Sequence, residues 1–72
     1  MYFYQRLRDL REDADKNQSE IARLLGMKRQ QYARYESGVQ EIPLHHIITL
    51  AQYYNVSLDY LAGLTDKKRS LL

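Results

Sequence analysis

Residues 28–36, KRQQYARYE, carry side chains that could make directed hydrogen bonds to base edges. If this segment is a helix, with about 100° of rotation per residue, Tyr32 and Tyr35 lie on one side of it. The opposite side holds short or polar side chains, namely Arg29, Gln30, Ala33, Arg34 and Ser37. We therefore expect the tyrosine side to pack inward and the opposite side to face outward.

The outward side has the chemistry of a DNA major-groove reader. Arginine can form two hydrogen bonds to guanine O6 and N7, and glutamine can do the same with adenine N6 and N7. Alanine leaves room for the backbone to approach or for a thymine methyl. Between Arg23 and Arg34 there are four basic residues and no acid. The pattern predicts base contacts from Arg29, Gln30, Ala33 and Arg34. The alternative is a helical hairpin with a solvated basic face, because such patterns have false positives.

A second short helix is expected directly before this segment. Asn17 can accept a hydrogen bond from the first free backbone N–H groups, and Glu20 three residues later completes a capping box. Ile21 and Leu25 then fall four residues apart on one face. Gly26 ends the helix, because glycine takes the left-handed conformation without steric cost. The sequence thus predicts two short helices joined by a tight turn.

Three further helices are expected around this pair. The first spans about residues 2–14 and has an apolar stripe of Phe3, Leu7, Leu10 and Ala14. Asp15 then takes a turn, since aspartate tolerates the left-handed conformation better than most residues. A fourth helix begins near Pro43, and its expected buried face is Leu44, Ile47, Ile48, Ala51 and Tyr54. Ser57 caps a last short helix with Leu58 and Leu61 inward, and Gly63 closes it.

Length and composition bound the class of protein. The chain has 72 residues, 44% of them hydrophobic, which is enough for one domain with one modest core. It has no cysteine, no apolar run of membrane-spanning length and no signal-peptide pattern, so we expect a soluble, cytoplasmic protein. The formal net charge of +2 is weak evidence for nucleic acid by itself. Its distribution is more informative, because acids are concentrated before residue 21 and bases between residues 23 and 34.

No cofactor, metal or catalytic site is expected. His45 and His46 are adjacent, so on a helix they point about 100° apart, and no cysteine or nearby third ligand completes a metal site. The histidines fit an exposed helix surface or a phosphate contact instead. The serines are expected in caps, turns or the tail, without a histidine and an acid arranged beside them. We therefore expect a protein that is not an enzyme.

The whole pattern resembles the Cro/C1-type (XRE-type) helix-turn-helix family. The residues that carry the motif are Gln18, Ala22, Gly26, Tyr32, Glu36 and Gly38. The similarity continues over residues 6–13 and 42–66, and so covers nearly the whole chain. It implies an all-α, compact five-helix, lambda-repressor-like domain over residues 1–66, with residues 67–72 as a basic and apolar tail.

The resemblance also assigns roles to residues outside the base-reading face. Arg11 is expected to form a partly buried ion pair with Glu36, which would tie the first helix to the third. The DNA backbone contacts that it implies come from Asn17, Gln18, Lys28, Gln31 and Ser37. For Asn17 and Ser37, simple capping and turn formation are equally compatible with the sequence. Lys28 stands where relatives usually have Ser or Thr, so a helix cap is lost and a cation is gained. The loop at residues 38–41 has no lysine or arginine.

The function implied is sequence-specific binding of double-stranded DNA by a prokaryotic or phage-type transcriptional regulator, most simply a repressor. Two-fold homodimers on a near-palindromic operator are expected, with no small-molecule ligand implied. The candidates for a dimer patch are Tyr53, Tyr54, Tyr60 and Leu64. The alternative is a protein-interaction module, antitoxin-like or anti-repressor, that uses the same fold. The low net charge and the acidic residue Glu41 favour that alternative.

Overall fold

Helix-forming segments with local start and stop signals account for most of the chain. The computed structural model describes residues 4–68, which form five helices and no strand. These are α1 (Tyr4–Asp13), α2 (Gln18–Leu24), α3 (Arg29–Glu36), α4 (Leu44–Tyr54) and α5 (Leu58–Leu61). The predicted five-helix, all-α fold is confirmed. The expected start of the first helix, including Phe3, lies outside the described residues.

The local signals place the helix ends where the sequence predicts them. The Asn17 side chain accepts from the backbone N–H of Glu20, and the Glu20 carboxylate accepts from the backbone N–H of Asn17, so the capping box is complete. The Ser57 side chain caps α5 by accepting from the N–H of Tyr60. Asp15 has φ 58°, as expected of the turn after α1. At Lys28, α3 begins without a side-chain cap.

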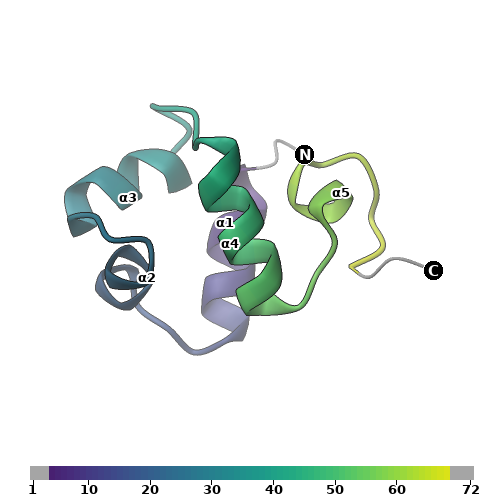
Figure 1. The fold of residues 1–72 in the computed structure, drawn as a ribbon, viewed down its shortest axis with the longest axis horizontal. Coiled ribbons are helices and arrows are strands. Elements are labelled where there is room, and N and C mark those ends of the chain that lie inside the picture. The colour runs from purple at the N-terminus through teal and green to yellow at the C-terminus, as the bar shows by residue number, and fades with distance from the viewer. Residues whose placement is uncertain (1–3, 69–72) are drawn as a thin grey trace.

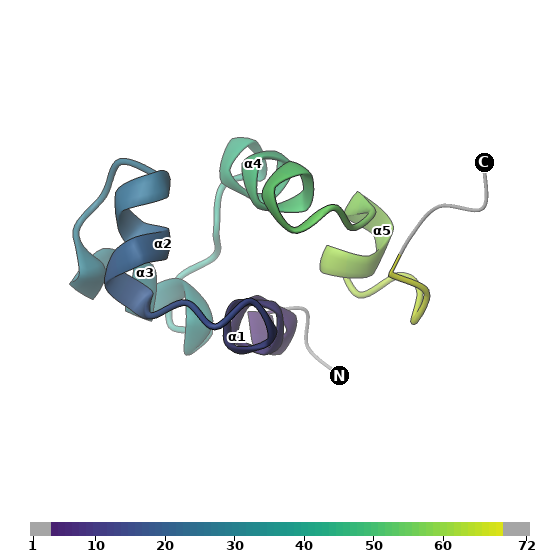
Figure 2. The same cartoon turned by 90° about the horizontal axis from the view of Figure 1, so that it is seen from below.

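All five helices contribute side chains to the core. In both views α2 and α3 form one end of the molecule and α5 the other, with α1 and α4 between them (Figures 1 and 2). Helix α1 packs against α3 and α5, α2 against α3, and α4 against α5. The buried apolar side chains are Leu7, Leu10, Ile21, Ala22, Leu25, Tyr32, Tyr35, Ile42, Leu50, Ala51 and Leu61. The core therefore joins the α2–α3 end to α5.

The buried face of α4 differs from the prediction. Leu44 is 66% exposed and Ile48 is 38% exposed, whereas Leu50, which was not expected to be buried, is fully enclosed. Ile47 and Tyr54 are partly buried against the core as expected. Residues 47, 50, 51 and 54 form the inward stripe, and Ile48 lies about 110° from its centre at helical spacing. The first turn of α4 projects beyond the core, which leaves Leu44 in solvent.

Two other apolar residues that were expected to be buried are exposed, for a related reason. Leu58 is 41% exposed, because it is the first residue of a one-turn helix whose inward side is occupied by Leu61. Ala14 is exposed because α1 ends at Asp13 and the chain turns there. Apolar periodicity therefore overestimated burial at the helix ends.

A buried arginine, which the sequence analysis did not single out, fixes the end of the chain opposite α3. Arg6 is 6% exposed, and its guanidinium lies 4.2 Å above the centroid of the Tyr60 ring. It donates to the Tyr60 carbonyl at 2.6 Å, to the Thr65 carbonyl, and to Asp66 Oδ1 at 2.8 Å. The signal was present in the sequence, since position 6 lies four residues before Leu10 on the apolar stripe.

The segment after α5 folds back onto the domain. The backbone N–H of Ser57 donates to the carbonyl of Lys68 at 2.7 Å, and the Lys68 amine lies 3.7 Å from the Asp13 carboxylate. Residues 65–68 are not helical. The first residues of the expected tail therefore form an irregular segment that folds back onto the domain. Residues 69–72 lie outside the described residues.

Candidate nucleic-acid interface

The turn between α2 and α3 sets the angle at which α3 is presented. Gly26 has φ 73°, the left-handed conformation that ends α2, and the N–H of Met27 reaches back to the Ala22 carbonyl at 3.0 Å. Tyr32 and Tyr35 on the inward side of α3 are buried, at 0% and 3% exposure. These two rings anchor α3 in the core, so its opposite side is held outward.

The outward side of α3 gathers the residues singled out as base readers. Arg29, Gln30 and Arg34 are exposed, and Ala33 is partly exposed between them. Lys28 is also exposed at the helix start. The structure therefore places these side chains on one accessible helical face, which is the arrangement that a major groove requires.

The cations of this region lack acidic partners. Among residues 4–68, Arg23, Lys28, Arg29 and Arg34 have no carboxylate within 4.0 Å, and Lys67 is the other such cation. Every other lysine or arginine in this range forms an ion pair, namely Arg6, Arg8, Arg11, Lys16 and Lys68. The cations without a carboxylate partner are thus concentrated on α2 and α3, where their charge would attract an anionic ligand.

The ion pair between Arg11 and Glu36 is present and buried. Arg11 Nε donates to Glu36 Oε2 at 2.6 Å, and a second guanidinium nitrogen donates to Oε1 at 3.1 Å. Arg11 also donates to the Lys16 carbonyl at 2.9 Å. The two-pronged contact joins α1 to the end of α3 and to the turn before α2.

The environment of Glu36 keeps it charged. Burial raises the pKa of the Glu36 carboxyl, but the hydrogen bonds from Arg11 and Gln18, with the Tyr32 hydroxyl close by, outweigh burial and hold the pKa below its ordinary value. The hydrogen bond to Glu36 is also the main cause of a raised pKa at Arg11. The Tyr32 hydroxyl is enclosed without a hydrogen bond of ordinary geometry, and burial raises its pKa strongly.

Gln18 connects this ion pair to the outward face. Its Nε2 donates to Glu36 Oε1 at 3.2 Å, and its Oε1 accepts from the guanidinium of Arg29 at 3.2 Å. Arg29 is thereby held through Gln18 and Glu36 to Arg11. The family resemblance assigned a DNA backbone contact to Gln18, but its bond to Arg29 was not predicted, because α2 and α3 must pack together before the two side chains are in reach.

Three other residues that were assigned to DNA backbone contacts already form hydrogen bonds within the protein. The Asn17 oxygen serves as the cap of α2, and the amide nitrogen of Gln31 donates to the Tyr35 hydroxyl at 3.2 Å. The Ser37 hydroxyl donates to the Arg34 carbonyl at 3.1 Å, which uses its one O–H donor. The capping and turn interpretation therefore describes Asn17 and Ser37 in this structure.

The loop after α3 approaches α1 closely and carries no cation. Gly38 has φ 79°, and a Cβ atom there would lie 2.6 Å from the Tyr4 ring, so both conformation and space require glycine. Val39 is exposed beside it. His45 and His46 lie on the first turn of α4, after this loop, and their ring centroids are 4.1 Å apart. Burial, followed by the neighbouring His45, lowers the pKa of His46.

The described part of the chain forms neither a metal-binding cluster nor a membrane-spanning helix. No group of three or more His, Cys, Asp or Glu side chains there is arranged to hold a metal ion. No helix formed by residues 4–68 combines the length and apolarity needed to cross a bilayer. Of the candidate dimer residues, Tyr53 and Leu64 are exposed, while Tyr54 and Tyr60 are partly buried against the core.

Comparison with known proteins supports this geometry. A helix-turn-helix family model matches residues 7–61. The chain is 38% identical over 64 residues to the HTH-type transcriptional regulator YobD of Bacillus subtilis (strain 168), covering 89% of this chain and 57% of that protein. It is 38% identical over 61 residues to the cryptic phage CTXphi transcriptional repressor RstR of Vibrio cholerae, covering 85% of this chain and 55% of the repressor. The chain therefore spans about half the length of these curated relatives.

Solved structures share the same fold. A transcriptional regulator from Listeria innocua superimposes with a TM-score of 0.82 at 30% identity, covering 88% of this chain and 59% of that one. The P22 c2 repressor chain, in its complex with synthetic operator 9T, superimposes with a TM-score of 0.80 at 18% identity, covering 90% of this chain and 98% of that chain. Together with the match over residues 7–61, these likenesses show that the chain belongs to the Cro/C1-type helix-turn-helix family.

Proposed function

We propose that this protein is a cytoplasmic transcriptional regulator, a repressor, that binds double-stranded DNA in a sequence-specific manner. The observation that carries the proposal is the outward face of α3, where Arg29 and Arg34 are exposed beside Gln30 and have no carboxylate partner in the described part of the chain. Unpaired guanidinium groups next to an amide are the donors that read guanine and adenine in the major groove. The similarity to the phage repressor RstR supports the direction of regulation.

Each residue of the interface has a proposed role. Helix α3 enters the major groove, where the base contacts come from Arg29, Gln30, Ala33 and Arg34. Backbone contacts, which set register without reading sequence, come from Asn17, Gln18, Lys28, Gln31 and Ser37. The Ser37 hydroxyl rotates away from the Arg34 carbonyl to donate to a phosphate. Gln18 also holds the Arg29 guanidinium at 3.2 Å, which reduces the conformational freedom that Arg29 loses on binding a base. The buried pair of Arg11 and Glu36 keeps α3 fixed to α1.

We further propose that the protein acts as a two-fold homodimer on a near-palindromic operator. Two copies would present two α3 helices about 34 Å apart, one turn of DNA. Tyr53, near the end of α4, and Leu64, after α5, are 44% and 77% exposed and are available for the contact. Helix α5 lies at the end of the molecule away from α3 (Figure 1). Sedimentation of the protein with and without duplex measures this directly. A one-to-one complex on a palindrome would remove the dimer from the proposal.

Selection from a random duplex library at near-physiological salt tests the main proposal. We expect recovery of a near-palindrome whose half-sites lie one turn apart. Affinity for it should fall steeply with added salt, because each phosphate contact releases counterions. If no shared sequence were recovered and no salt dependence found, a protein-interaction module would replace the regulator, as the exposed Val39 and Leu44 and the cation-free loop would allow.

A further inference from the structure

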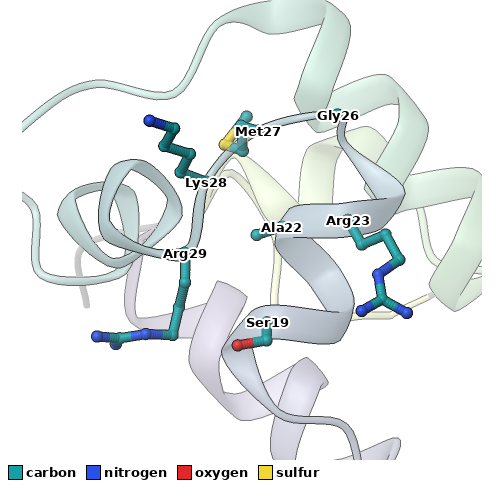
Figure 3. A pocket seen from close by; sticks show the side chains of 7 residues that line it. All are labelled: Ser19, Ala22, Arg23, Gly26, Met27, Lys28 and Arg29. Carbon is teal, nitrogen blue, oxygen red and sulfur yellow. The ribbon is translucent and has the colours of Figure 1, made fainter.

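A hollow at the α2–α3 turn includes residues to which no DNA contact has been assigned above. We call it the elbow hollow. It is lined by Ser19, Ala22, Arg23, Gly26, Met27, Lys28 and Arg29 (Figure 3). Two of these residues, Lys28 and Arg29, belong also to the proposed DNA-reading surface. The hollow is therefore continuous with that surface.

The hollow follows from the spacing of residues on α2. Ser19, Ala22 and Arg23 are followed by Gly26 at intervals that place all four on one helical face. Ala22 is buried and forms the floor together with Met27, which comes from the turn. At Gly26 a Cβ atom would meet nothing within 4 Å, so the space there is open. Small side chains thus leave room for another molecule to come close to α2.

The rim of the elbow hollow carries positive charges that have no acidic partner in the described residues. Arg23, Lys28 and Arg29 surround it, no acidic residue lines it, and none of the three has a carboxylate within 4.0 Å in residues 4–68. Their charged ends point away from one another around the rim (Figure 3). A single small anion would touch only one of them, whereas an extended chain of anionic groups could reach several.

We propose that the elbow hollow seats a stretch of DNA backbone next to the groove that α3 enters, with Arg23 and Ser19 as additional phosphate contacts. This inference rests on the proposed function. A DNA strand carries one charge per about 3.4 Å, which suits spread-out cations. Arginine and serine side chains are common phosphate donors, and the Ser19 hydroxyl makes no side-chain hydrogen bond in the described residues.

The continuity of the surface favours DNA over an acidic protein segment. A duplex that brings bases to Arg29 and a phosphate to Lys28 must also bring its backbone past the α2–α3 turn, because Lys28, Arg29 and Arg23 all line the same hollow at this turn (Figure 3). An acidic peptide in the hollow would instead have to compete with that duplex for Lys28 and Arg29. The same binding event therefore explains all three unpaired cations of the rim.

The test is the salt dependence of duplex binding by Arg23→Gln. We expect about fivefold weaker binding on every duplex near 0.15 M salt, and a slope of log affinity against log salt that is smaller by about 0.9. Ser19→Ala should weaken binding uniformly by less, because its hydroxyl carries no charge. Both substituted side chains are exposed and outside the ion pairs, so an unchanged melting temperature is the check on folding.

Lys67→Gln is the matched control. Lys67 is also exposed and has no carboxylate within 4.0 Å among residues 4–68, but it follows α5, the helix at the end of the molecule opposite α2 and α3 (Figures 1 and 2). It should leave both affinity and salt slope unchanged. A wild-type salt slope in Arg23→Gln would overturn the inference while leaving the proposed function intact. So would an acidic peptide that binds through Arg23 while the slope stays unchanged. Absence of duplex binding by the wild-type protein would overturn both.

Discussion

The surfaces of α1 and of the α2–α3 pair use the same residue type in opposite ways. On α1, Arg6, Arg8 and Arg11 each pair with a carboxylate within 4.0 Å. On α2 and α3, Arg23, Arg29 and Arg34 pair with no carboxylate of residues 4–68. Arginines that are already paired hold the protein together, whereas arginines left without a partner retain donors and charge for a ligand.

The paired and the unpaired arginines are also expected to contribute to different free energies, the former to folding and the latter to binding. Arg6 and Arg11 are buried and bonded to distant segments, so their loss leaves buried partners unsatisfied in the folded protein. The cations of α3 are solvated, and their removal is expected to change binding rather than folding. Gln18 is the bridge between the two groups, because it bonds to Glu36 on one side and Arg29 on the other.

The largest effect is expected for Arg11→Met. The substitution leaves the Glu36 carboxylate buried and unpaired, so the free energy of unfolding should fall by about 3–5 kcal/mol in urea denaturation. The double variant Arg11→Met with Glu36→Leu should recover much of this loss, since it removes both charges together. Unchanged stability in the single variant would show that α1 and α3 are held together without the pair.

The ion pair of Arg11 and Glu36 should also make the free energy of unfolding depend on pH in the acid range. Because the folded-state pKa of Glu36 lies below its ordinary 4.5, its contribution is fully present above that value and is lost as pH falls through the folded-state pKa. Between the two pKa values, stability should drop by about 1.4 kcal/mol per pH unit. Urea denaturation over an acid pH series should show this slope in the wild type and a shallower one in Glu36→Gln. Equal slopes would contradict the assignment.

Arg29→Ala tests whether the arginines without carboxylate partners contribute to DNA binding. We expect a loss of about 1–3 kcal/mol in binding free energy at one base position, with relaxed specificity there and little change in melting temperature. Lys28→Ala is the matched variant, and it should weaken all sequences alike and lower the salt slope by about one. Both effects are measured by titrating a panel of single-base operator variants. Equal loss on every duplex for Arg29→Ala would move it to the backbone contacts.

The smallest effect is expected at Arg8. Its ion pair with Glu12 is exposed and spans four residues of α1 at 3.5 Å, so Arg8→Ala should lower the free energy of unfolding by only about 0.3–0.5 kcal/mol. Thermal melts beside Arg11→Met provide the comparison. A loss as large as that of Arg11→Met would show that exposure does not separate the two pairs of α1.

The sequence predicted the helix-turn-helix unit well because its signals are local. The capping box at Asn17 and Glu20 closes over three residues, and Gly26 ends α2 by its own conformation. The inward side of α3 followed from the spacing of Tyr32 and Tyr35. These features depend on hydrogen bonds and rotations within a few residues, so neighbouring residues are enough to specify them.

Only the tertiary structure decided the features that depend on distant segments. The partners of Arg6 lie 54 to 60 residues away, and periodicity could not name them. The rotation of α4 that buries Leu50 instead of Ile48 depends on what packs against it. The bond from Arg29 to Gln18 and the elbow hollow exist because the turn brings α2 and α3 together. By itself, the sequence determined which side chains α3 offers, and the packing of helices decided how those side chains are held.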